Sequence, residues 1–553
     1  MDRSEGLGPF VRDLAGRLEQ LEAPALRAAI VAYASRLPVE RRSGLARAFV
    51  AEQRPPDLSA VDAVVADAAA LRGDLEAGVY ERGWGSDGWD EMPIWEDTSW
   101  LGPLAVILEA ATDFFLAADD ASAFAVYGAL FGVLAAEDDM GPLFESDDLD
   151  PLGVDRSELV ARFLRTAAGC PGTPPERADR VFQAIELTGV YAASGVGLVG
   201  ASDARADPIS GLDVVAGELL KRLCGLASSS PAGSAWEVLI VEAALIAGGA
   251  DRLGEVVREA AATLPRLLVE WVDALTVEGR TVDAISAADV CLGLTLERAR
   301  HADLNDRLVA LLADAGDDAG ALEAARAALD GEPSLARLAA FADAAREVGR
   351  LDAELGRVAD GFAGQGRTQS LIGGLVLVLA GRLDQALAAA RSAPPLGWSA
   401  GNAASIVVPA VQRLALGSHR SARVEALLDL HAPGVVIAGR YQDPQGWPGE
   451  RLGSVLRERI DALRETLLPA AITAALADVG VVVERRVAAI VEAKHRGAYG
   501  RAASVACAHA DALAVAVSPA AAASFLDALL ARYPRHSSFK GAIDAERRGG
   551  SRA

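Results

Sequence analysis

A short pattern that recurs through the middle of the chain constrains its fold more than any other feature. Three copies begin at Gly316, Gly349 and Gly381, 33 and then 32 residues apart, and each places a leucine six residues after the glycine. A looser copy begins at Gly279. A period of this length fits one helical hairpin per repeat, in which glycine ends one helix and an aspartate begins the next. We therefore expect consecutive helix pairs that pack on one another.

Hydrophobic periodicity extends the helical prediction to other parts of the chain. Apolar residues recur at intervals of three and four in the segments 10–21, 25–37, 39–52, 58–77, 101–118 and 121–136. At 553 residues the chain is longer than one compact core supports, and a repeat array accommodates that length because each repeat contacts only its neighbours. The expected fold class is all-α: an α-solenoid of antiparallel helix pairs, wound as a right-handed superhelix.

Breaks in the periodicity divide the predicted array. We expect an N-terminal helical module, an acidic Trp-rich loop, a repeat array, an irregular loop and C-terminal helical repeats, over residues 1–78, 79–100, 101–431, 432–450 and 451–553. The clearest repeats cover 279–395, and a further irregular stretch covers 189–211. The capping sequences Asp155-Arg-Ser-Glu and Ser518-Pro each predict the start of a helix.

Charge limits the classes of partner. The formal charge of −24 repels nucleic acid and anionic membranes, so we expect neither as a partner, and a basic or cationic protein segment is easier to accommodate. The first residues have no apolar stretch behind a basic end, and the most apolar run, Leu371–Ala380, is about half of the roughly 20 residues of a spanning helix. We expect a cytoplasmic protein. The arginine-rich composition, with only three lysines, indicates a GC-rich bacterial genome.

Half of the eight tryptophans fall in one acidic segment. Gly85, Gly88 and Pro93 argue against a regular helix there, so we expect a loop with aromatic anchors. One hypothesis is that the loop binds a basic peptide or a cationic group, because aromatic faces and carboxylates both attract cations. The alternative is that the tryptophans turn inward and cover the core while the acids stay in water. The residues concerned are Trp84, Trp89, Trp95, Trp100, Asp87, Asp90, Glu91, Glu96 and Asp97.

The sequence contains no convincing catalytic, cofactor or metal signature. The four cysteines form no CxxC pair, and the six histidines include no HExxH. Gly195-Val-Gly-Leu-Val-Gly200 matches a dinucleotide-binding fingerprint by letter, but the residues that follow do not suggest a helix and no alternating strands and helices flank it. We expect an interhelical loop there, and no catalytic residue, cofactor or metal ion.

The segment from about Gly279 to Pro395 resembles a divergent array of tetratricopeptide-type repeats, with aliphatic residues at most of the usual aromatic positions. The acidic Trp-rich loop, Tyr499-Gly-Arg-Ala-Ala503 and Tyr533-Pro-Arg-His536 also resemble helical regions of bacterial proteins, some of which carry a SWIM zinc finger. That finger needs a Cys-x-Cys and a Cys-x-His pair, and this chain has only Cys507-Ala-His509. The second resemblance therefore implies the helical region without the zinc finger.

These observations predict a non-enzymatic scaffold or adaptor that holds a protein partner. Helical-hairpin arrays present extended surfaces, and tetratricopeptide-like proteins usually bind other proteins. The alternative is a ligand-sensing or enzymatic protein whose pocket is assembled from the loops at 189–211 and 432–450. Association of copies of the chain into a homo-oligomer stays open.

Overall fold

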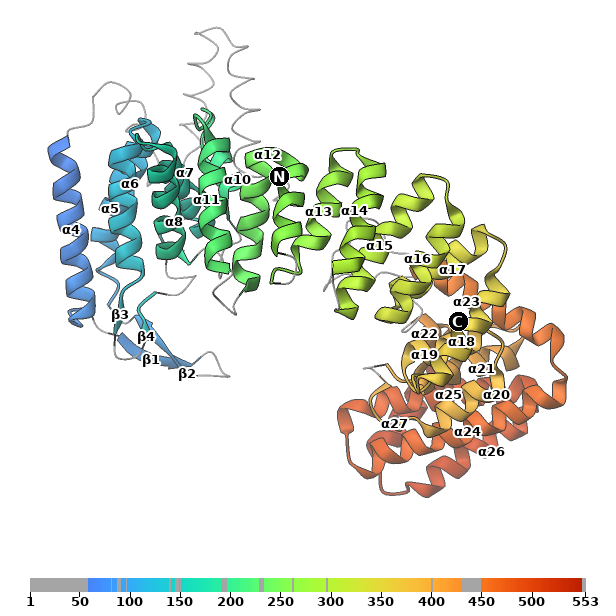
Figure 1. The fold of residues 1–553 in the computed structure, drawn as a ribbon. Helices are drawn as coiled ribbons and strands as arrows, with labels where there is room; N and C mark the ends of the chain where they lie inside the picture. Colours follow the sequence, from blue (N-terminus) through green and yellow to red (C-terminus); the bar gives the residue numbers. More distant parts are fainter. Residues whose placement is uncertain are drawn as a thin grey trace, which may run out of the picture. The chain divides into compact units, whose positions relative to one another are not determined.

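The computed structural model describes residues 58–80, 82–86, 91–95, 97–138, 141–144, 149, 151–189, 196–227, 233–260, 263–294, 297–398, 401–429 and 449–549 (Figure 1). The chain divides into two compact units, with the boundary between Ala287 and Ala288. This boundary lies inside the range that the sequence predicts as one array, within helix α14 (Thr281–Leu294). The helices predicted over 10–21, 25–37 and 39–52 lie outside the described residues.

The described part of the first unit is mainly helical. Helix α4 covers Leu58–Glu76, α5 covers Leu101–Leu116 and α6 covers Asp120–Leu134, which confirms three of the predicted helices. The other elements are β1 (Arg82–Ser86), β2 (Glu91–Trp95), β3 (Glu137–Asp138), β4 (Gly141–Pro142), α7 (Arg156–Gly169), α8 (Pro174–Thr188), α10 (Leu198–Asp203), α11 (Leu212–Ala227), α12 (Gly233–Ala260) and α13 (Leu267–Val277). Helix α12 is interrupted at Gly248 and Gly249, where the backbone leaves the helical conformation.

Helices of the first unit pack largely in chain order. Helix α6 contacts α5 and α7, α8 contacts α7 and α11, and α12 contacts α11 and α13. The start of α7 is as the sequence predicts, because the Asp155 carboxylate accepts a hydrogen bond from the Ser157 N–H at 2.7 Å. Glu158 does not complete a capping box, since its carboxylate pairs with Arg162 one turn further along the helix.

The acidic Trp-rich segment contains a β-hairpin, which differs from the predicted irregular loop. Strands β1 and β2 pair antiparallel, with Arg82 opposite Trp95 and Ser86 opposite Glu91. A second, shorter hairpin joins β3 and β4. Tryptophan is favoured in strands, and backbone pairing satisfies peptide groups that a loop would leave to water. The helical framework of the predicted fold class is confirmed among the described residues, with these two hairpins added to it.

The described part of the second unit consists of helices, with one isolated bridge between Ser370 and Asn402. The helices are α15 (Arg298–Asp314), α16 (Asp318–Gly331), α17 (Leu335–Glu347), α18 (Leu351–Gly364), α19 (Leu371–Leu379), α20 (Leu383–Ser392), α21 (Ala403–Leu416), α22 (Ala422–Asp429), α23 (Gly449–Thr466), α24 (Pro469–Glu492), the 3₁₀ helix η3 (Arg496–Ala498), α25 (Tyr499–Ala516), α26 (Pro519–Arg532) and α27 (Ser537–Gly549). The start of α26 is as predicted, because the Ser518 hydroxyl accepts from the Ala521 N–H at 3.1 Å.

Glycines turn the chain between the two helices of each predicted repeat. The turns from α13 to α14, α15 to α16, α17 to α18 and α19 to α20 contain Gly279 (φ +74°), Gly316 (φ +78°), Gly349 (φ +67°) and Gly381 (φ +71°). In the second turn the Asp317 N–H donates to the Leu312 carbonyl at 2.8 Å, and the other three close in the same way. This closure needs one residue in the left-handed conformation, which glycine adopts without strain. The predicted role of these glycines is confirmed.

Helix α21 lies at the centre of the later part of the second unit. All of its residues except Arg413 are buried, and it packs against α19, α20, α22, α23, α24 and α25. Helix α23 also contacts α17 and α19. In a one-dimensional array each repeat contacts only its neighbours. Helices α19, α20 and α22 to α25 therefore surround one buried helix, an arrangement that the repeat pattern did not predict.

Candidate functional site

The structure describes only part of the predicted Trp site. Trp89, Asp87, Asp90 and Glu96 lie outside the described residues, and for Trp84 and Glu91 only the backbone of the hairpin is described. Trp95, Asp97 and Trp100 are described with their side chains. The cation-anchor hypothesis therefore stays a prediction for most of the set.

Trp100 and Trp95 pack into an aromatic cluster with Phe144. Trp100 is 2% exposed, and its ring centroid lies 5.3 Å from that of Trp95 and 5.1 Å from that of Phe144, in an edge-to-face arrangement with the latter. Trp95 is half-buried. For Trp100 the geometry is that of the core-covering alternative, because a buried ring offers no free face to a cation.

Asp97 has a local structural partner. The backbone N–H of Ser99 donates to the Asp97 carboxylate at 2.8 Å, and this bond, with a second one from the Ser99 side chain, holds the pKa of that carboxyl below its usual value. The bond precedes the start of α5, where a carboxylate also faces the positive end of the helix dipole. Asp97 therefore has a role in ordering the entry to α5.

The described part of the glycine-rich fingerprint, residues 196–200, lies against a carboxylate of the chain itself. Gly197 precedes α10, so the sequence does open a short helix there, which corrects the expectation of a loop. A side chain at Gly197 would collide with the carboxylate of Glu242 on α12. Burial raises the pKa of Glu242, and backbone N–H groups of Leu198 and Val199 hydrogen-bond it. The anion-binding end of α10 is thus occupied by an acid of the chain itself.

Cys507 and His509 are core residues of α25. Each is 2% exposed, and the His509 ring packs edge-on against Phe525 at 4.8 Å. Burial raises the pKa of Cys507 to about 11 and lowers that of His509 to about 4, so at neutral pH both are uncharged. Among the described residues no group of three or more His, Cys, Asp or Glu side chains is placed to hold a metal ion.

A pocket with an acidic lining lies among the first helices of the second unit. Its volume is about 270 Å³. Its lining consists of Val309 and Ala313 from α15, Asp318 and Ala321 from α16, and Ala340, Asp343, Ala344 and Glu347 from α17. We call it the acidic pocket. Three carboxylates surround small apolar side chains, and the lining residues include no basic group.

The spacing of the carboxylates on α17 favours a positively charged occupant. Asp343 and Glu347 are four residues apart and therefore neighbours on one helix face, where like charges destabilise a helix by roughly 0.2–0.5 kcal/mol. Arg346 lies 3.8 Å from Asp343, which offsets part of this repulsion. A cation seated in the pocket would lie beside the carboxylates of Asp318, Asp343 and Glu347.

Arg337 fixes the helices that form the acidic pocket. This arginine of α17 is 9% exposed and pairs with Asp303 and Asp306 of α15 at 2.9 Å each, and with Glu332 after α16 at 2.7 Å. A planar guanidinium with several donors suits such a junction. The network joins α15, α16 and α17, so the three carboxylates of the acidic pocket are carried on a fixed frame.

No family model, curated protein or solved structure matches the sequence. None of the helices in the described ranges combines the length and the apolar composition that a membrane crossing requires. The assignment of function therefore depends on the chemistry of the sites in the two units.

Proposed function

We propose that the protein is a non-enzymatic scaffold, a tetratricopeptide-like solenoid of antiparallel helix pairs in its repeat region, that holds a protein partner through a cationic segment. The observation that carries the proposal is the acidic pocket, in which Asp318, Asp343 and Glu347 surround small apolar side chains. Small side chains leave room for an incoming lysine or arginine, whose stem packs on alanine while its charge meets the carboxylates. The overall charge of −24 also attracts a cationic partner at long range.

The strength of this contact is limited by its exposure to water. Asp318 and Glu347 are exposed, and exposed ion pairs contribute roughly 0.2–1 kcal/mol each. Three such pairs give only weak binding, so neighbouring repeats must supply further contact area. An array of helix pairs provides such a surface.

Two triple variants of the full chain test the proposal. The first neutralises the pocket with Asp318→Asn, Asp343→Asn and Glu347→Gln. The control neutralises exposed acids elsewhere on the same unit with Asp289→Asn, Asp384→Asn and Glu465→Gln. Both variants change the net charge by the same amount, so the long-range field is matched. Co-purification from the cells that make the protein, followed by mass spectrometry, compares what each variant retains.

We expect one protein to be retained by the wild type and the control and to be lost from the pocket variant. Its release should occur at moderate salt, because exposed ion pairs are screened within about 10 Å at 0.1 M ionic strength. Equal retention by both variants would show that the acidic pocket is not the contact. Catalytic turnover of a retained small molecule by the purified chain would contradict the non-enzymatic assignment.

A ligand-sensing or enzymatic protein is the second candidate function. Only residue 189 and residues 196–211 of the first loop and residues 449–450 of the second are described, so a pocket built from these loops stays a prediction. One observation favours small-molecule binding at a different position: a pocket of about 350 Å³ in the second unit has three arginines in its lining. Self-association and a cytoplasmic location also stay predictions.

A further inference from the structure

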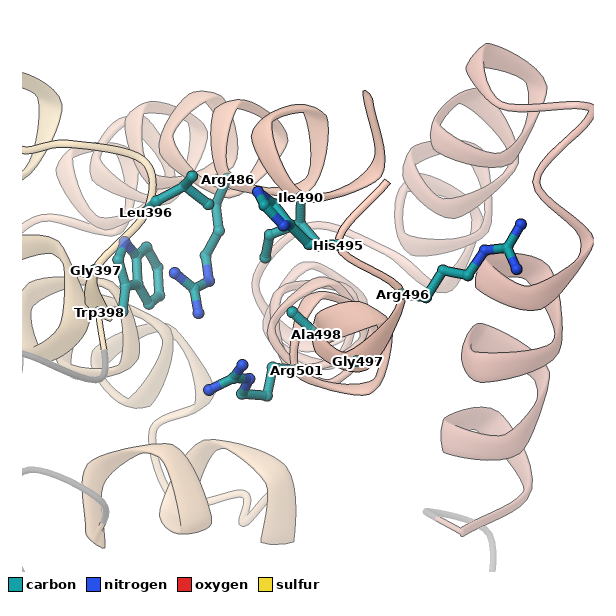
Figure 2. A pocket seen from close by; sticks show the side chains of 10 residues that line it. All are labelled: Leu396, Gly397, Trp398, Arg486, Ile490, His495, Arg496, Gly497, Ala498 and Arg501. Carbon is teal, nitrogen blue, oxygen red and sulfur yellow. The ribbon is translucent and has the colours of Figure 1, made fainter. Parts of the chain in front are cut away.

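A pocket of about 350 Å³ lies in the second unit where three segments meet (Figure 2). Leu396, Gly397 and Trp398 come from the link between α20 and α21, Arg486 and Ile490 come from α24, and His495, Arg496, Gly497, Ala498 and Arg501 come from the turn into α25. We call it the arginine pocket. Its lining residues include no carboxylate, although the chain as a whole carries a charge of −24.

The link that carries Trp398 is fastened on both sides. The Asn402 side chain caps α21 and donates to the carbonyls of Pro394 and Leu396 at 3.0 and 3.3 Å. From α24, Arg485 donates to the carbonyl of Ala393 at 3.5 Å and also to that of Arg391. These bonds fix the wall of the pocket in place before any ligand enters, which lowers the entropic cost of binding.

Arg486 is the central group of the arginine pocket. It is 7% exposed, and its guanidinium carbon lies 4.1 Å from the centroid of the Trp398 ring. One terminal nitrogen donates to the Pro395 carbonyl at 3.3 Å, whereas Nε has no hydrogen-bond acceptor among the described residues. No carboxylate of the described chain pairs with it. A buried cation without a counter-charge is costly, because burial removes its hydration.

The other buried arginines of the described chain are paired with acids. Arg165 in the first unit is 1% exposed and lies 2.7 Å from the Asp207 carboxylate. Arg337 in the second unit is 9% exposed and pairs with three carboxylates. Arg486, at 7% exposed, is also buried and differs from these two in having no acidic partner among the described residues. The missing counter-charge is therefore specific to this pocket.

Two further positive features point at the same space. Figure 2 shows the guanidinium groups of Arg486 and Arg501 converging beside Trp398, whereas Arg496 points away from the pocket. The pocket also lies at the start of α25, where the positive end of the helix dipole favours an anion. Burial, together with the charge of Arg501, lowers the pKa of Arg486 to about 10, so the group is still cationic at neutral pH.

We propose that the arginine pocket binds a small organic anion, whose carboxylate or phosphate group lies between Arg486 and Arg501 and whose apolar body lies against Leu396, Trp398 and Ile490. Arginine presents paired donors that match the geometry of either oxyanion. The pocket volume is near the lower end of the range for small-molecule sites, which suits a ligand of about one ring. This site is separate from the acidic pocket and does not depend on the proposed scaffold function.

Isothermal titration of the full chain with three one-ring probes tests the proposal. Benzoate carries a carboxylate, phenyl phosphate carries a phosphate, and benzamide is a neutral control of the same shape. At constant ionic strength we expect at least one anion to bind with a Kd below about 1 mM, and benzamide to bind at least tenfold more weakly. The tighter of the two anions identifies which oxyanion the site prefers. Binding of benzamide as tight as that of both anions would overturn the proposal.

Arg501→Gln and Arg496→Gln form a matched pair of variants. Both arginines are exposed, Arg496 in η3 and Arg501 in the first turn of α25, so each variant should fold and each removes one positive charge. We expect Arg501→Gln to weaken binding of the preferred anion at least fivefold and Arg496→Gln to change it less than twofold. Equal effects, or no binding of either anion below about 10 mM by the wild type, would refute the site. Arg486→Gln should abolish binding, and the exposed pair keeps the test valid if that variant does not fold.

Discussion

Trp100→Ala tests whether the described part of the Trp-rich segment belongs to the core. A tryptophan side chain buries about 150–250 Å², and at about 25 cal/mol per Å² this is worth about 4–6 kcal/mol as an upper bound. Trp100 is 2% exposed and touches two other rings, so nearly all of this contribution is lost on truncation. We expect the first unit to lose about 3–5 kcal/mol, the usual range for such a change.

Hydrogen exchange of the full chain is the suitable assay, because two compact units can unfold separately and a single melting temperature would mix them. In Trp100→Ala the free energy of opening measured at the α5 amides should fall by about 3–5 kcal/mol. In Trp95→Ala it should fall by less, because Trp95 is only half-buried. Val106→Ala, at a position of α5 that is 59% exposed, is the control and should change it by less than about 0.5 kcal/mol. A loss below about 1 kcal/mol for Trp100→Ala would refute the core role.

Two further predictions concern the second unit. Gly349→Ala places a side chain at φ +67° and should destabilise the α17–α18 pair by about 1 kcal/mol. Gly356→Ala, inside α18 with open space around it, should instead stabilise the pair by about 0.5–1 kcal/mol. Hydrogen exchange of the α18 amides measures both changes. His509 is kept neutral in the fold with a pKa of about 4 against an ordinary value of 6.5, so stability is lost as pH falls from 6.5 toward 4, by up to about 1.4 kcal/mol per pH unit. His509→Gln should remove this part of the pH dependence of α25 exchange, and an unchanged slope would contradict it.

Local signals in the sequence predicted local structure well. The left-handed glycines of the repeat turns and the Ser518 cap of α26 are decided by residues within one helical turn, so the sequence alone places them. The hairpin in the Trp-rich segment is different, because strand pairing depends on a partner strand and a register. The glycines and proline that indicated a loop there are also compatible with short paired strands.

The arrangement of the second unit depends on contacts between residues far apart in the chain. Helix α21 carries apolar residues around most of its circumference, a pattern that indicates full burial. Its central position is therefore reflected in the sequence. Arg486 also left a trace, since it follows Val483 by three residues and precedes Ile490 by four, on the buried face of α24. The sequence does not show that the Trp398 ring, far away in the chain, packs on the Arg486 guanidinium. It also does not show that no carboxylate of the described residues pairs with Arg486. The acidic pocket likewise could not be predicted, because its lining comes from three helices whose facing residues meet only in the folded structure.

Because Arg486 has no acidic partner among the described residues, the direction of the stability change on replacing it can be predicted. Arg337→Met removes the cation from three carboxylates and should destabilise the second unit by about 3–5 kcal/mol, the usual cost of breaking a buried ion network. Arg486→Met leaves no carboxylate without its partner, and it replaces an unpaired buried charge with an apolar side chain of similar length. In the absence of ligand, the free energy of unfolding should therefore stay the same or rise by about 1–4 kcal/mol. Exchange of the α17 and α24 amides measures both. A loss for Arg486→Met as large as for Arg337→Met would mean that the fold itself needs this charge. Opposite effects would mean that the chain keeps a destabilising cation, which an anionic ligand in the arginine pocket explains.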